Sequence, residues 1–183
     1  MDMPQRFATV AEYRVIKDKN IKISKNFFCK GMNEVRLDSM DVIEENVIIR
    51  GDLSRIHIGS GTIIDKGVVL HPCLDSPTPP FDYKNLAIGS QCYIGKNTIV
   101  CSRMIGNNVY IGNDCIISDR VEIGSNVKIP DGSYIPPDTK ILDNCVFGGK
   151  PAKYLGELTE TFQIWINEFC SNYYYNLYVS QNE

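Results

Sequence analysis

The sequence predicts an all-β fold, a parallel β-helix built from hexapeptide repeats, followed by one C-terminal α-helix. Between residues 88 and 141 an apolar anchor recurs every six positions, with a single five-residue step. The residue four places after an anchor is small or β-branched, and near the C-terminus the apolar spacing changes to threes and fours. A six-residue period predicts a β-helix, and the later period predicts an amphipathic helix. The anchors are Ile88, Ile94, Val100, Ile105, Ile111, Ile117, Ile123, Ile129, Ile135 and Ile141.

Each hexad supplies one short strand and one corner. Three hexads close a triangular coil of about eighteen residues, and successive coils stack about 4.8 Å apart. The anchor and the small residue both point into the prism. Glycine often follows the anchor, as at Gly89 and Gly95, and we expect it there because it tolerates a backbone conformation that a Cβ would strain. Resemblance to known hexapeptide-repeat proteins implies that the helix is left-handed.

The chain divides into an arm, a solenoid and a helix. Residues 1–20 show no six-residue pattern and are predicted to form an N-terminal arm. Residues 21–154 are predicted to form the β-helix domain, interrupted at 71–87 by a proline-rich loop that cannot join a sheet ladder. Residues 155–183 are predicted to form an amphipathic helix that lies along the prism, with Thr159 as its N-cap.

Composition excludes several function classes. The 183 residues contain 43% hydrophobic residues and carry a net charge of -3, which predicts one domain with a proper core and no nucleic-acid footprint. No apolar run approaches the ~20 residues that span a bilayer, and the N-terminus lacks the apolar stretch of a signal peptide. The odd count of seven cysteines favours a reduced, cytoplasmic protein.

The proline-rich loop is the first candidate binding element. Pro79 and Pro80 stiffen it, and Phe81 and Tyr83 are aromatic anchors of the kind that protein partners bury. Two interpretations stay open. The loop either presents these four residues to a partner or folds back over the solenoid, with Phe81 covering exposed isoleucines.

Arg50 and Asp52 are the second candidate. Counting back in sixes from Ile58 places Asp52 on the anchor row and Arg50 on the small-residue row. An unpaired buried charge is prohibitive. We therefore expect the two to pair with each other for a structural purpose or to face a subunit contact, with catalysis as a third alternative.

Two enzyme classes use this scaffold, and each requires particular residues at particular positions. The order of motifs resembles the gamma-class carbonic anhydrases, which hold zinc with three histidines. The first ligand position matches His71, but the other two fall on Lys96 and Cys101, and the chain has only two histidines. A mixed site of His71, Cys73 and Cys101 remains as an alternative. A hexapeptide acyltransferase would need a histidine base, for which His57 is the other candidate.

A second resemblance covers nearly the whole chain. The sequence resembles the dynactin subunit 5 family of hexapeptide-helix proteins. The matching segments are Phe28-Cys29-Lys30-Gly31, residues 47–53, Pro79-Pro80-Phe81, Ile105-Gly106, Ile111-Gly112, Ile141-Leu142-Asp143-Asn144, Gly156-Glu157-Leu158 and Tyr173-Tyr174-Tyr175.

The resemblance implies a non-enzymatic subunit of the dynactin pointed-end complex, in the cytoplasm and on the cytoskeleton. Its implied partners are dynactin subunit 6, an actin-related protein, dynactin subunit 4 and dynein adaptors, with no cofactor, metal, nucleic acid or membrane insertion. We expect Pro79, Pro80, Phe81, Tyr83, Arg50 and Asp52 to contact partners. The isolated chain is open to self-association.

Overall fold

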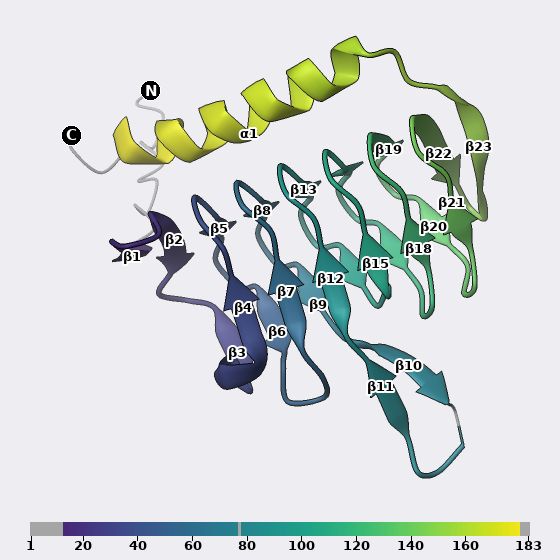
Figure 1. The fold of residues 1–183 in the computed structure, drawn as a ribbon, viewed down its shortest axis with the longest axis horizontal. Helices are drawn as coiled ribbons and strands as arrows, with labels where there is room; N and C mark the ends of the chain where they lie inside the picture. Colours follow the sequence, from purple (N-terminus) through teal and green to yellow (C-terminus); the bar gives the residue numbers. More distant parts are fainter. Residues whose placement is uncertain (1–12, 77, 180–183) are drawn as a thin grey trace, which may run out of the picture.

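In a computed structural model, which describes residues 13–76 and 78–179, the chain winds as a three-sided left-handed β-solenoid with one C-terminal helix (Figure 1). The predicted fold class is confirmed. The predicted arm lies largely outside the described residues, and so does Pro77 of the proline-rich loop. Three sheets form the sides of the prism, and we name them sheets A, B and C.

Sheet A lies beneath the helix, and its strands are parallel except at the two ends, where β1 and β23 pair antiparallel. Its strands are β1 (Tyr13–Ile16), β2 (Ile21–Ser24), β5 (Val42–Ile43), β8 (Ile63–Ile64), β13 (Tyr93–Ile94), β16 (Tyr110–Ile111), β19 (Val127–Ile129), β22 (Cys145–Gly149) and β23 (Ala152–Glu157).

Sheets B and C are six-stranded and form the other two sides. Sheet B comprises β3 (Phe28–Lys30), β6 (Ile48–Arg50), β9 (Val69–Leu70), β14 (Ile99–Val100), β17 (Ile116–Ile117) and β20 (Tyr134–Ile135). Sheet C comprises β4 (Val35–Leu37), β7 (Ile56–Ile58), β12 (Leu86–Ile88), β15 (Met104–Ile105), β18 (Glu122–Ile123) and β21 (Lys140–Ile141).

The anchors stack in the prism interior as predicted. Ile94 pairs in register with Ile111, and Ile111 with Ile129, and all three are fully buried. The small residues between them, such as Cys92 and Cys115, are also fully buried. Each anchor stabilises the fold by about 2 kcal/mol through the apolar area that it removes from water.

The glycine after an anchor has a different role from the one predicted. Gly89 and Gly95 do not have a positive φ, whereas Gln91 and Asn97, three places after the same anchors, do (55° and 57°). A Cβ on Gly95 would lie 2.5 Å from the carbonyl carbon of Gly112 in the next coil. The prediction of backbone strain at this glycine is therefore wrong. Glycine is needed at this position because the next coil approaches closely. The left-handed backbone conformation is adopted instead by residues such as Gln91 and Asn97.

Helix α1 (Thr161–Val179) covers the outer face of sheet A. Phe162, Ile166, Cys170 and Tyr174 form its buried stripe. The helix begins at Thr161, after the predicted N-cap Thr159 and after strand β23. Its apolar side packs against Val42, Ile63, Tyr93 and Tyr110 of sheet A. Within the described chain, no helix combines the length and apolar character needed to cross a membrane.

Candidate partner-binding site at the irregular corner

The departures from the hexapeptide repeat all stack at one corner of the prism. Val42 pairs with Ile63, twenty-one residues on, whereas Ile111 pairs with Ile129, eighteen residues on. The extra residues of the early coils fall between sheets B and C, and so does the proline-rich insertion. We call this edge the irregular corner; among the described residues it comprises 30–34, 50–55, 71–76, 78–85 and 101–103. It lies on the opposite side of the prism from α1 (Figure 1).

The proline-rich insertion forms a β-hairpin that projects from this corner. Strands β10 (Cys73–Ser76) and β11 (Asp82–Lys84) pair antiparallel, with Leu74 opposite Tyr83. Pro79 and Pro80 are exposed at the tip, and Phe81 keeps 61% of its surface exposed. Phe81 therefore does not cover the isoleucines of the solenoid, so the folded-back alternative does not describe this structure. Tyr83 sits at the root, edge-on to the ring of His71 with a centroid distance of 5.8 Å.

Two residues of a later coil hold the root of the hairpin. The backbone N–H of Leu74 donates to Oδ1 of Asp119 at 2.8 Å. The carbonyl of Leu74 accepts a hydrogen bond from Nη1 of Arg120 at 3.0 Å. Arg120 is itself fixed by a bidentate ion pair with Asp138, at 2.6 and 2.8 Å. The hairpin therefore leaves the prism in a defined direction before any partner binds.

Side-chain charges at the hairpin are largely satisfied within the chain. Lys84 lies 2.6 Å from Asp82 and 3.5 Å from Asp75, and Arg103 lies 3.7 Å from Asp75. These pairs are partly exposed, and such pairs add little to stability. The exposed side chain of Phe81 at the tip is therefore the part of the hairpin that has no partner among the described residues.

Arg50 and Asp52 pair as expected but occupy a different place. Because extra residues separate Ile49 from Ile56, Ile49 takes the anchor position and pairs with Leu70. The predicted placement of Asp52 on the anchor row is therefore wrong, and Asp52 lies in the corner turn. Arg50 donates hydrogen bonds to the two carboxylate oxygens of Asp52, at 2.8 and 3.1 Å.

Lys30 from the preceding coil lies 3.3 Å from Asp52 and completes a cluster of two cations around one carboxylate. Hydrogen bonds from Arg50, and then Lys30, lower the pKa of Asp52 to about 2. The corner therefore carries an excess positive charge beside the hairpin.

His71 and Cys101 of the proposed mixed metal site follow the neighbouring strands β9 and β14, and Cys73 lies close enough to Cys101 to raise the pKa of its thiol. Nδ1 of His71 lies 2.8 Å from the carbonyl of Pro72, Cys73 is fully buried, and Lys96 is exposed. Burial raises the pKa of the Cys101 thiol to about 11, so without a metal this thiol is protonated at neutral pH. No cluster of three or more histidine, cysteine, aspartate or glutamate side chains suited to a metal occurs among residues 13–76 and 78–179.

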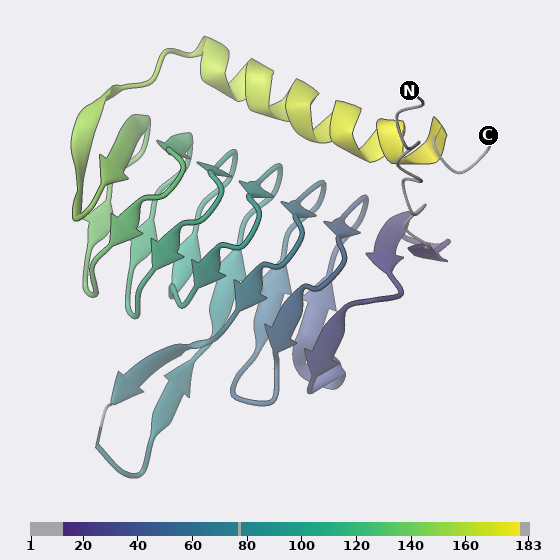
Figure 2. The same ribbon diagram turned by 180° about the vertical axis from the view of Figure 1, so that it is seen from behind.

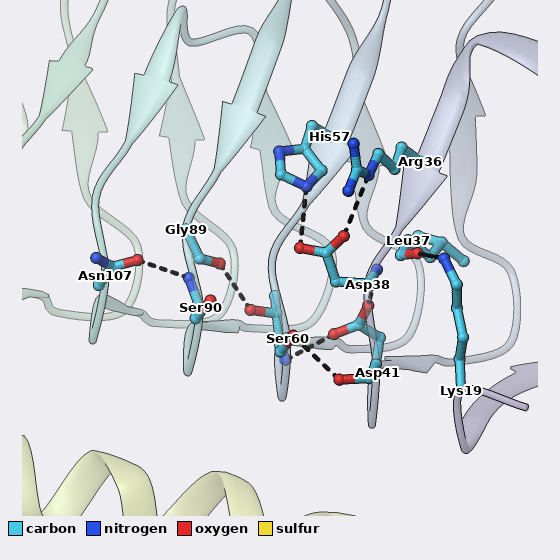
Figure 3. Close-up of polar contacts among 12 residues, drawn as sticks. Lys19, Arg36, Leu37, Asp38, Asp41, His57, Ser60, Gly89, Ser90 and Asn107 are labelled. Atoms are coloured by element: carbon cyan, nitrogen blue, oxygen red, sulfur yellow. Dashed lines mark hydrogen bonds and ion pairs between the residues drawn. The ribbon is translucent and has the colours of Figure 1, made fainter.

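His57 lies on β7, on the outer face of sheet C, beside Arg36 and Asp38 (Figure 3). Its Nε2 is 3.1 Å from Oδ2 of Asp38, and Nε of Arg36 is 3.3 Å from the other oxygen of that carboxylate. The sequence did not indicate Asp38 as a partner of His57, because the two residues lie on neighbouring coils and nineteen positions apart in the chain. A histidine oriented by a carboxylate is the arrangement of a general base. Arg36 makes this pair a weaker candidate for a general base, because it also binds the carboxylate of Asp38.

Comparison with known proteins identifies the family. A model of the family described as "Dynactin subunit 5" matches residues 1–181. The chain belongs to the dynactin subunit 5 family. Dynactin subunit 5 of Dictyostelium discoideum is 33% identical over 104 residues, which cover 57% of this chain and 43% of that protein. The resemblance predicted from the sequence is confirmed.

Other relatives of this family member share the scaffold. Gamma carbonic anhydrase 2 of Arabidopsis thaliana is 24% identical and covers 85% of this chain. The match spans 57% of that anhydrase, so the chain corresponds to little more than half of its length. The crystal structure of a hexapeptide transferase family protein from Anaplasma phagocytophilum superposes with a TM-score of 0.67 at 22% identity, over 88% of this chain and 92% of that one. At this identity the likeness shows the fold.

Proposed function

We propose that this chain is a non-enzymatic assembly subunit of the dynactin pointed-end complex, which helps dynein attach to cargo adaptors. It acts in the cytoplasm, on the cytoskeleton. Its contacts are with dynactin subunit 6, an actin-related protein, dynactin subunit 4 and dynein adaptors. Family membership supports the complex, and the irregular corner supports a role that works by contact.

The observation that carries the proposal is the hairpin. Its tip presents Pro79, Pro80 and Phe81 to solvent, while its root is held by Asp119 and Arg120. An exposed aromatic on a fixed support loses little conformational entropy on binding, so most of its apolar burial contributes to affinity. Tyr83 lies at the root of the hairpin, and Arg50 and Asp52 lie in the same irregular corner, where they would form the polar rim of such an interface.

An affinity pull-down from native cells tests the contact role of the hairpin. Phe81→Ala is expected to lower recovery of at least one pointed-end partner about 10-fold or more, as for an interface hot spot. Ile164→Ala is the matched control, because Ile164 is 62% exposed on α1, on the opposite side of the prism. Equal recovery with both variants would refute the role of the hairpin.

The pairing of His57 with Asp38 favours acyl transfer as the second candidate function, on the scaffold that transferases share. That candidate predicts turnover of an acyl-thioester by the purified chain and its loss in His57→Asn. We expect no turnover above that of His57→Asn, because Arg36 competes with His57 for the carboxylate of Asp38. A rate that falls at least about 100-fold in His57→Asn would establish the enzyme instead.

A further inference from the structure

The three sheets end differently at the C-terminal end of the prism, where the strands are green in Figure 2. In sheet A, β23 pairs antiparallel with β22 and covers the last parallel strand. In sheet B the last strand is β20, and Pro136 follows it directly. In sheet C the last strand is β21, which pairs only with β18 among the described strands. An uncovered strand edge offers unpaired backbone groups to another chain.

The hydrogen bonds between coils show which backbone groups of β21 are left over. In sheet C the residue after each anchor donates its N–H to the carbonyl of the anchor in the next coil. The three bonds run from Gly89 to Ile105, from Gly106 to Ile123 and from Gly124 to Ile141, at 2.9, 2.8 and 2.9 Å. Leu142 holds this position in the last coil, so its N–H has no strand of the described chain to bond. Glu122 likewise donates to Thr139 of the next coil, and its equivalent in the last coil is Lys140. The N–H groups of Lys140 and Leu142 and the carbonyl of Lys140 therefore point beyond the last strand.

Sheet B has a less open edge, because a proline stands at the corresponding position. There Ser118 donates its N–H to the carbonyl of Ile135, at 3.1 Å. Pro136 is the equivalent of Ser118 in the last coil, and proline has no N–H to donate. Sheet B therefore lacks the donor that sheet C offers at Leu142, and proline on an edge strand discourages pairing.

A groove of about 640 Å³ lies beside the open edge of β21. Its apolar lining includes Leu142, Phe147, Tyr154 and Leu158. Leu142 and Tyr154 keep 70% and 58% of their surface exposed. Strand addition to a sheet uses both features, because backbone hydrogen bonds supply affinity and pockets take alternate side chains of the added strand.

The charges at the groove favour a basic occupant. Asp143 and Glu157 line the groove, and neither forms an ion pair with a described residue. Lys140 also lines the groove, but it pairs with Glu122 at 4.0 Å. The rim therefore carries two carboxylates that a cation of a partner can meet, and such complementarity selects partners by charge.

We propose that the open edge of β21 and its groove bind an extended segment of another protein, in which apolar residues alternate with lysine or arginine. The segment adds one strand to sheet C and bonds the free backbone groups of Lys140 and Leu142. Its apolar side chains enter the groove, and its cations meet Asp143 and Glu157.

Leu142 argues against a second copy of this chain stacked end to end. A Cβ on Gly106 would lie 2.6 Å from the carbonyl carbon of Gly124, so a side chain at this position points at the backbone of the next coil. Leu142 places a large side chain there. A further coil would meet this side chain, because its backbone continues into the corner below. An isolated strand can bend away after the residue that accepts from Leu142, and so avoids it.

Amide hydrogen exchange of the purified full chain, with and without a peptide, tests the proposal. The probe is Lys-Val-Lys-Val-Lys-Val-Lys with blocked ends, and Glu-Val-Glu-Val-Glu-Val-Glu is its control. The amides of Lys140 and Leu142 should exchange rapidly in the free chain and slow about 10-fold or more when the lysine peptide saturates it. The glutamate peptide should bind about 10-fold more weakly or less.

Leu142→Pro closes the edge and is the most direct variant. Proline suits this position, because Pro130 and Pro136 follow the anchors Ile129 and Ile135 at the same place in the hexad. Leu142→Pro should weaken binding of the lysine peptide about 10-fold or more, since it removes a donor. Leu142→Ala is the control, because it shortens the side chain and keeps the N–H, and it should weaken binding less.

A second pair of variants tests the charges and does not depend on the folding of Leu142→Pro. Glu157→Gln should weaken binding of the lysine peptide about 3-fold. Glu168→Gln makes the same change at an exposed residue of α1, outside the groove lining, and should leave binding unchanged.

Three results would overturn the proposal. The first is the absence of saturable binding of the lysine peptide up to about 2 mM. The second is binding that leaves the amides of Lys140 and Leu142 unprotected, or that Leu142→Pro and Leu142→Ala weaken equally. The third is an end-to-end dimer that Leu142→Pro disrupts, which would assign the edge to a second copy. Phe81→Ala should not change peptide binding, so this test is separate from the proposed role of the hairpin.

Discussion

The close approach of successive coils predicts that one added methyl group at Gly95 destabilises the solenoid. Its Cβ would lie 2.5 and 2.6 Å from the carbonyl carbon and oxygen of Gly112 and 2.7 Å from the backbone nitrogen of Asn113. These are backbone atoms and cannot rotate away, so the coils must separate locally. Separation also strains the hydrogen bond that Gly95 donates to Ile111, now 2.8 Å long. We expect Gly95→Ala to lower the free energy of unfolding by about 2–4 kcal/mol.

Gly132 provides the control for this prediction, because its constraint is conformational. Its φ is +66°, and the nearest atom to an added Cβ is Nζ of Lys150 at 3.7 Å. Gly132→Ala should cost about 1–2 kcal/mol for the left-handed backbone. Gly132→Asn should cost less, since Asp114 and Asn97 adopt the same conformation at the same corner, one and two coils earlier. Urea unfolding followed by circular dichroism measures all three variants. A Gly95→Ala variant as stable as the wild type would refute the steric argument.

Three further predictions concern the core, the charge cluster and the hairpin. Ile111→Asp should unfold the solenoid, because it buries an unpaired carboxylate; retained native circular dichroism would contradict this. The pKa of Asp52 is lowered to about 2, so the stability from its ion pairs is present above about pH 4 and lost as the pH falls toward 2. Asp52→Asn should therefore flatten the acid limb of the stability profile, and an unchanged limb would argue against the cluster. Arg120→Ala should speed amide exchange in the hairpin, because it removes the hydrogen bond that Arg120 donates to the Leu74 carbonyl. Asp138→Ala keeps that hydrogen bond and should speed exchange less. Equal effects of the two variants would show that this hydrogen bond does not hold the hairpin.

The repeat made the solenoid predictable, because every coil solves the same packing problem with the same six positions. The ten anchors between Ile88 and Ile141 could be assigned to the interior from their spacing alone. The role of Gly95 could not, since contact between coils joins residues about eighteen apart and leaves no local trace. The placement of Asp52 failed for a related reason. Counting in sixes from Ile58 assumes regular coils, and the early coils carry extra residues at the irregular corner.

The candidate site was only partly visible in the sequence. Proline content showed that residues 71–87 leave the sheet, and the aromatic residues suggested a partner. The clamp from Asp119 and Arg120 to Leu74 was not predictable, because it joins segments about forty-five residues apart through backbone atoms of the hairpin. The exposed apolar residues on the outer face of sheet B, such as Ile99 and Ile116, could have been found from the sequence, since each directly precedes an anchor residue. That they share one side of the prism follows only from the assignment of the strands to three sheets.

The composition of the complex recovered with this chain from its native cells tests the central claim most directly. An account based on contact predicts recovery with other dynactin pointed-end subunits in near-equal amounts and no zinc bound in proportion to the chain. Recovery of the chain as a homotrimer with one zinc per chain, and without dynactin subunits, would contradict it.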